Sequence, residues 1–186
     1  DNDQLLSESF FEKGMVHGRE LAPSIEQTTK TCGIPLSEID LIAVDIGPGS
    51  FTGLRVGLAT AKGLCLGLHK PILGVVSLDA MAEAARGKGD SLCPLLDAKW
   101  DQLYGAIFTA EGRSEIFSEK PEECVHKIPS GTTIFGTALE KYAELFRNYP
   151  TLGSEFAYPK PSEIGRIAAR DYAAGRRDDV SSLVPL

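Results

Sequence analysis

The chain has 186 residues, of which 42% are hydrophobic and 24% are charged, and these proportions are typical of a globular protein rather than a disordered one. Its length fits one domain of ordinary size or two small lobes. The formal net charge of −7 argues against a large nucleic-acid-binding face formed by this chain alone. A partner could still carry such a basic surface.

The four cysteines are widely spaced, with no C-x-x-C pair and no histidine pair nearby: Cys32, Cys65, Cys93 and Cys124. A chain of this length can bury a core without disulfides, so we expect free, mostly buried thiols in a reducing compartment. The sequence contains no run of 18 apolar residues and no signal peptide. These features favour a cytoplasmic protein that does not enter a membrane.

The first half of the chain alternates predicted strands with predicted helices. The strands are expected over residues 4–11, 41–47 and 70–76, and the helices over 19–31, 51–68 and 77–85. Pro23 fits only the first turn of its helix, and Gly33 is the expected stop. Strands and helices that alternate in this way indicate an α/β fold.

The second half begins after a glycine-rich loop at 87–91 and has a different pattern of predicted elements, a hairpin followed by helices. A hairpin is expected over 92–112, with a polar turn at 97–101 and with Trp100 and Tyr104 packed in it. A strand over 132–136, a helix over 137–149 and a last helix capped by Ser162 complete the chain. The pattern predicts mixed sheets in two lobes, residues 1–91 and 92–161, with residues 162–186 packing back on the first.

The stretch DIGPGSFTGLRVGLATAKG, residues 45–63, places a turn rich in glycine and proline before a helix. It is not a P-loop, because Gly47 and Gly53 are one residue too far apart and no Gly-Lys-Ser/Thr follows. It is not a dinucleotide fingerprint, since Thr52 replaces the third glycine. Pro48 replaces the first glycine of a nucleophile elbow. Three common chemistries are therefore excluded.

Two interpretations of this turn remain. A helix N-terminus can hold an anion through its free amides, and Gly47, Gly49 and Ser50 are the candidate residues, with Asp97 as a further nucleotide-binding candidate. Alternatively, the two glycines supply unusual backbone angles and Ser50 or Thr52 caps the helix.

The helix over 51–68 is apolar on nearly all sides, because its two charges, Arg55 and Lys62, lie seven residues apart on one stripe. Small residues form two further stripes, one of Gly53, Gly57 and Ala61 and the other of Gly63 and Gly67. One stripe is expected to pack on the protein's own sheet. The other is either covered internally or forms an interface with a partner or a second copy.

The segment DIGPGSFTGLRVGLATAKGLCLGLHKPILGVVSLDAMA resembles the TsaB (YeaZ) family, which acts in the synthesis of threonylcarbamoyladenosine in bacterial tRNA. LLDAKWDQLYGAIF is similar to the family's later DAR…VY segment, with Lys99 where Arg is common. The resemblance covers most of the chain and is weak between Thr109 and Pro161. It implies an actin-like, sugar-kinase-like ATPase fold of two ribonuclease-H-like lobes, whose usual first strand has no counterpart in this chain.

The resemblance also bears on catalysis. The catalytic relative TsaD shares this block but carries a metal-binding H-x-x-x-H motif, and its two positions fall here on Ser77 and Met81. A hydroxyl is a weak ligand and a thioether is too soft to replace imidazole on such a metal. The resemblance therefore implies neither a metal site nor catalytic residues in this chain.

The function implied is that of a non-catalytic scaffold subunit, which binds and stabilises a TsaD-like partner for threonylcarbamoyl transfer to an adenosine of tRNA. A TsaE-like ATPase would join the complex, tRNA would bind only through it, and the chain alone would form a homodimer. The resemblance implies no tightly bound cofactor, with ATP or ADP at the complex interface. The helices over 19–31 and 51–68 would supply the interface residues Leu21, Ile25, Gly53, Gly57, Thr60, Ala61 and Leu64.

An alternative of another class uses the same fold. The protein would then be a small ATPase or kinase, with Asp97 near the phosphates and the turn at 47–53 helping to hold them.

Overall fold

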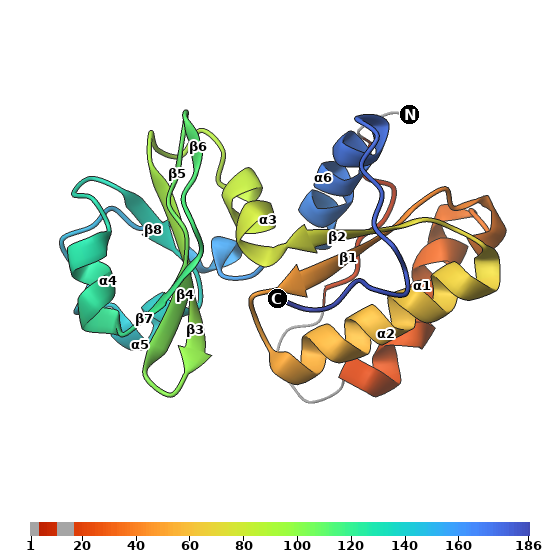
Figure 1. The fold of residues 1–186 in the computed structure, drawn as a ribbon, viewed down its shortest axis with the longest axis horizontal. Coiled ribbons are helices and arrows are strands. Elements are labelled where there is room, and N and C mark those ends of the chain that lie inside the picture. The colour runs from red at the N-terminus through yellow and green to blue at the C-terminus, as the bar shows by residue number, and fades with distance from the viewer. Residues whose placement is uncertain (1–3, 11–16) are drawn as a thin grey trace. The chain divides into compact units, whose positions relative to one another are not determined.

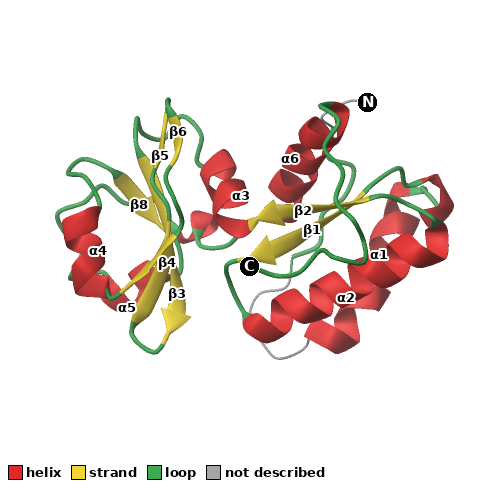
Figure 2. Cartoon of the chain, viewed as in Figure 1, coloured by secondary structure: helices red, strands yellow, loops and turns green. Residues whose placement is uncertain are grey.

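The structure is a computed structural model that describes residues 4–10 and 17–186 (Figures 1 and 2). Contacts divide the chain into two compact units, one formed by Asp1–Val76 with Lys160–Leu186 and the other by Ser77–Pro159. The sequence had placed these boundaries after residues 91 and 161. The helix that follows Val76 therefore groups with the second unit.

The first unit is built on two parallel strands, β1 (Ile42–Gly47) and β2 (Ile72–Val76), joined by helix α2 (Phe51–Leu68). Parallel neighbours need a crossover connection, and α2 provides it. Helix α1 (His17–Cys32) packs against α2, and α6 (Pro161–Ala173) contacts both strands. Figure 1 shows α2 and α6 on opposite sides of the strands. A short 3-10 turn, η1 (Leu36–Glu38), leads into β1.

Local signals account for most of these boundaries. Gly33 ends α1 at a φ of 69°, and the amide of Ile34 donates to the carbonyl of Thr29, as in a Schellman motif. Pro23 lies inside α1 rather than in its first turn, because the helix begins at His17. No amide at position 23 can donate to the carbonyl one turn earlier.

The predicted strand over 4–11 is wrong for residues 4–10, which form no strand, and residue 11 lies outside the described residues. A strand needs a paired neighbour, and within the described chain β1 pairs with β2 alone. Glu8 instead reaches α6, where its Oε1 accepts a hydrogen bond of 2.8 Å from the amide of Ser162. Ser162 is therefore not the cap of α6: Lys160 holds that position and Pro161 begins the helix.

The second unit contains a mixed sheet centred on β3 (Leu92–Lys99), which pairs antiparallel with β4 (Gln102–Gly105) and β5 (Phe108–Thr109) and parallel with β8 (Thr133–Phe135). The order is β6-β5-β3-β4-β7, where β6 is Gly112–Arg113 and β7 is Phe117–Glu119. The remaining elements are α3 (Ser77–Ala84), α4 (Pro121–Lys127), α5 (Ala138–Tyr142) and η2 (Ser154–Phe156).

The predicted hairpin over 92–112 is present, but its second strand is divided into β4 and β5. The sequence pattern missed β7 and α4, and it made α5 longer than the helix observed. Cys93, Leu95, Leu103, Phe117 and Phe146 are among the buried residues that form the core of this unit. β3 supplies a continuous run of buried residues, as expected for a strand covered on both faces.

The four cysteines are free, as predicted, and Cys65, Cys93 and Cys124 are buried. Burial, with the nearby Glu119 carboxylate, raises the pKa of Cys124 to about 11. Such a thiol carries almost no thiolate at neutral pH and is a packing group rather than a nucleophile.

Gly136 offers a test of the second unit. Its φ is 116°, and a Cβ placed on it would overlap the carbonyl oxygen of Leu95. Gly136→Ala should therefore lower the free energy of unfolding by about 3 kcal/mol, measured by chemical denaturation. Gly131→Ala is the matched control: its φ is 83°, but the added Cβ meets nothing within 4 Å, so about 1 kcal/mol is expected. Equal losses would contradict the steric explanation.

Candidate functional site

The turn between β1 and α2 is shaped by hydrogen bonds within the chain. Gly47 has a φ of 101°, which favours glycine, and it precedes Pro48 through a cis peptide bond. Ser50 caps α2, its Oγ accepting a hydrogen bond of 3.3 Å from the amide of Gly53. Gly49 does not adopt a positive φ, so of the two glycines only Gly47 has the unusual angle that the sequence indicated for both.

Two amides of this turn are thus already engaged. The amide of Gly47 donates to Asp45 Oδ1 at 2.8 Å, and the amide of Gly53 donates to Ser50. An amide that already donates within the chain is not available to a phosphate. The anion site at Gly47, Gly49 and Ser50 stays a prediction.

Asp97, the fourth nucleotide-binding candidate, lies on β3 in the second unit. Its Oδ1 accepts from the amide of Lys99 at 2.9 Å, and its Oδ2 lies 3.2 Å from Lys99 Nζ. Burial alone would raise the pKa of Asp97, but the hydrogen bonds from Lys99 outweigh it and lower that pKa. Asp97 is an ionised carboxylate that organises the end of its own strand, and its role toward a nucleotide stays a prediction.

Ser77 and Met81, the two positions where the catalytic relative has metal ligands, stand one helical turn apart on α3. Each of these residues is only 1% exposed. Among residues 4–10 and 17–186, no three His, Cys, Asp or Glu side chains are grouped so that they could hold a metal ion.

Helix α2 has a covered face and an open one. Leu58, Ala61 and Cys65 form the covered face and pack with residues of β1 and β2. Ala61, which the sequence assigned to a partner interface, is only 6% exposed, because the rotation of the helix turns it toward its own sheet. Its side chain is therefore covered by this chain.

The other predicted interface residues are half-buried: Gly53, Gly57, Thr60 and Leu64 on α2, and Leu21 and Ile25 on α1. At Gly57, Gly63 and Gly67 an added Cβ would meet nothing within 4 Å. Internal packing therefore does not require glycine at any of these three positions. Each glycine in a helix interior nevertheless costs about 0.5–1 kcal/mol relative to alanine.

Two exposed apolar side chains of α2 were not singled out by the sequence reasoning. Phe51 is 68% exposed and Leu66 is 66% exposed, and the Arg55 guanidinium lies 3.6 Å from the centre of the Phe51 ring. Their signal in the sequence was weak, since both belong to a helix that is apolar all round. At 3.6 residues per turn, Leu66 lies on the opposite side of α2 from Gly57, so these side chains do not belong to the surface around Gly57.

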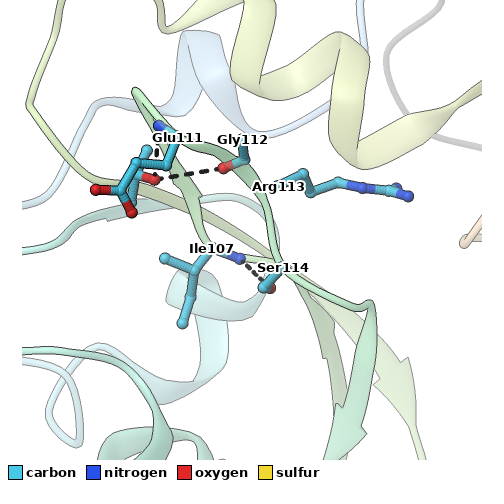
Figure 3. Close-up of a pocket in the computed structure, with 6 residues that line it drawn as sticks. Ile107, Glu111, Gly112, Arg113 and Ser114 are labelled. Atoms are coloured by element: carbon cyan, nitrogen blue, oxygen red, sulfur yellow. Dashed lines mark hydrogen bonds between the residues drawn. The ribbon is translucent and has the colours of Figure 1, made fainter.

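A pocket occurs elsewhere, at the β5–β6 hairpin, lined by Ile107, Thr109, Glu111, Gly112, Arg113 and Ser114 (Figure 3). Two of its polar residues are engaged within the chain: Ser114 Oγ accepts from the amide of Ile107, and Arg113 pairs with Asp79 at 3.3 Å. Figure 3 shows the Arg113 side chain extending away from Glu111. The pocket offers no group of side chains pointing to a particular ligand.

Comparison with known proteins supplies the family. Residues 14–163 match the family model described as TsaD: tRNA N6-adenosine threonylcarbamoyltransferase. The chain belongs to this family. It is 28% identical over 172 residues to the tRNA threonylcarbamoyladenosine biosynthesis protein TsaB of Haemophilus influenzae, across 84% of this chain and 72% of that protein. It is 27% identical over 183 residues to the Escherichia coli protein of the same name, across 91% of this chain and 79% of that protein.

These relatives place the chain in the TsaB (YeaZ) group of the family, as the sequence resemblance implied. The solved structure of YeaZ from Pseudomonas aeruginosa superimposes with a TM-score of 0.79 at 22% identity, and the match covers 94% of this chain and 86% of that one. The predicted actin-like fold with ribonuclease-H-like lobes is confirmed. No helix in the described part of the chain is both long and apolar enough to cross a membrane.

The open space at Gly57 yields a prediction on stability. Gly57→Ala should raise the free energy of unfolding of the monomeric chain by about 0.5–1 kcal/mol, because the methyl group removes backbone freedom and meets no neighbour. Gly74→Ala on β2 is the contrasting control, since its Cβ would lie 2.7 Å from Ile46 Cγ2. Denaturation should show opposite signs for the two variants, and a loss at Gly57 would contradict the open surface.

Proposed function

We propose that this chain is a non-catalytic subunit in the biosynthesis of threonylcarbamoyladenosine in tRNA, where it binds and stabilises a TsaD-like catalytic partner. The observation that carries the proposal is the surface of α2 on which Gly57 faces open space. Family membership supplies the pathway, and this surface supplies the means of binding. A TsaE-like ATPase belongs to the same proposed complex.

The contact is best suited to another helix. Side chains normally hold packed helices 8–10 Å apart, and glycine at the contact permits a closer approach. Gly57 has Gly53, Thr60 and Leu64 as neighbours on the helix surface, and α1 adds Leu21 and Ile25. The half-buried positions of these residues leave apolar area that a partner would remove from water.

The same surface explains why a partner would be needed. Helix α2 carries glycines whose cost to helix stability no internal contact offsets. Contacts made in a complex would offset that cost. Without the catalytic partner, we propose that two copies of the chain cover the surface by forming a homodimer.

A bulky residue at Gly57 tests the interface. Gly57→Leu should abolish co-purification with the cognate TsaD-like protein, because the added side chain fills the space that a partner helix would occupy. The monomeric variant should give the circular dichroism spectrum of the parent chain and unfold at a temperature no lower than the parent, since the site is open in the monomer and leucine favours a helix more than glycine does. The measurement is pull-down of the tagged full chain, followed by size-exclusion chromatography.

Gly63→Leu is the matched control on the same helix, also at a position that is open within 4 Å but on its exposed side. It should retain the complex. If both variants bind normally, the interface assignment is wrong. If only Gly63→Leu loses binding, the partner contacts the exposed side of α2 instead.

We also propose that the isolated chain does not bind ATP at the β1–α2 turn, and that any nucleotide sits where the complex is assembled. The amides of Gly47 and Gly53 support this view, because both already donate hydrogen bonds within the chain. Calorimetry of the isolated chain with ATP and Mg²⁺ should show no binding up to millimolar concentrations. Tight binding with turnover would favour the alternative of a small ATPase of the same fold.

A further inference from the structure

The tip of the β3–β4 hairpin exposes the chain's single tryptophan. Trp100 is 95% exposed, and the expectation that it packs within the hairpin is wrong. Three consecutive residues, Lys99, Trp100 and Asp101, have φ values of 66°, 52° and 54°. A two-residue hairpin turn of this kind favours Asn-Gly, and a bulky aromatic residue with positive φ is rare. Unusual backbone conformations of this kind concentrate at functional sites.

Charged side chains on both sides hold this turn in place. Asp97 accepts hydrogen bonds from the amide and the ammonium group of Lys99. Asp101 Oδ1 accepts from Lys141 Nζ and from the hydroxyl of Tyr142, each at 3.1 Å. The indole is therefore presented on a braced turn instead of lying against the protein.

The surroundings of Trp100 resemble a base-stacking platform more than a protein anchor. Of the large apolar side chains that the described residues expose, only Trp100 and Tyr158 belong to the second unit. Lys99 and Lys141 flank the turn, and Lys120 is close enough to Asp101 to act on its charge. A protein hot spot sits among apolar contacts, whereas this ring stands among lysines that are paired with the carboxylates of Asp97 and Asp101. Lysines that exchange a carboxylate for a phosphate, beside an exposed aromatic ring, suit an unpaired base and its backbone.

We propose that Trp100 stacks on an unpaired base of the tRNA held by the complex, with Lys99 and Lys141 near the adjoining phosphates. This inference rests on the proposed function, in which tRNA is bound by the assembled complex. The chain's net charge of −7 means that one stacking contact cannot hold tRNA by itself. The contact therefore positions an RNA whose backbone is held mainly by the partner.

The single tryptophan gives a direct signal. The chain labelled with 5-fluorotryptophan should show one ¹⁹F resonance, and it is mixed with its unlabelled TsaD-like partner. Addition of tRNA should shift and broaden that resonance, because stacking changes the shielding of the ring. An RNA duplex without unpaired bases should leave it unchanged. Trp100→Ala should weaken tRNA binding by the complex about tenfold, and Trp100→Phe should keep it within about threefold.

Other outcomes overturn the proposal in distinguishable ways. A resonance that shifts when the partner is added, and not further with tRNA, would show that Trp100 fills a protein pocket. A resonance that stays unchanged while the complex binds tRNA would show that no base reaches it. Failure of the two proteins to co-elute would refute the proposed function itself, and the tRNA contact with it.

Discussion

The packing of α2 on the parallel pair β1 and β2 is the interaction on which the first unit depends. Two parallel strands expose most of their apolar side chains unless helices cover them. On one side of the strands, α2 packs Leu58, Ala61 and Cys65 against Val44, Ile46 and Ile72. Because this packing fixes the rotation of α2 about its axis, it also determines that Gly57 is left open. The fold and the proposed binding surface are thus set by the same contact.

The C-terminal segment completes the unit from far along the chain. The amide of Gly74 donates to Asp178 Oδ2 at 2.8 Å, and Arg176 donates to the carbonyl of Gly74 at the same distance. Leu183 packs so close to Gly74 that a Cβ there would lie 3.1 Å from its Cδ1. Gly74 is therefore a glycine that internal packing demands. Internal packing does not require a glycine at position 57. This contrast supports the proposal that the open face of α2 is a binding surface.

The β1–α2–β2 segment could be predicted because it depends on residues close together in the sequence. Contacts between distant residues could not be predicted from the sequence pattern. An apolar run bounded by turn residues predicts β1, and a capping residue at Ser50 predicts the start of α2. Residues 4–10 form no strand, because pairing needs a neighbour that the sequence pattern cannot supply. The second strand of the hairpin is divided, because β4 and β5 pair with different parts of β3. In the candidate site, spacing grouped Ala61 with Gly57, but only the sheet decides which of them is covered. The exposure of Trp100 could not be predicted either, because it depends on the backbone geometry of the turn.

The buried positions of Ser77 and Met81 bear on why this chain should act through a surface. Both belong to α3, whose neighbouring residues Leu78 and Ala80 are fully buried. Two imidazoles placed there would be polar rings in an apolar core, without the solvent access that a substrate needs. In this chain α3 packs as part of the core, so exchanging these two side chains alone would place imidazoles without access to solvent. The face of α2 that its own core leaves uncovered is the surface through which we propose that the chain acts instead.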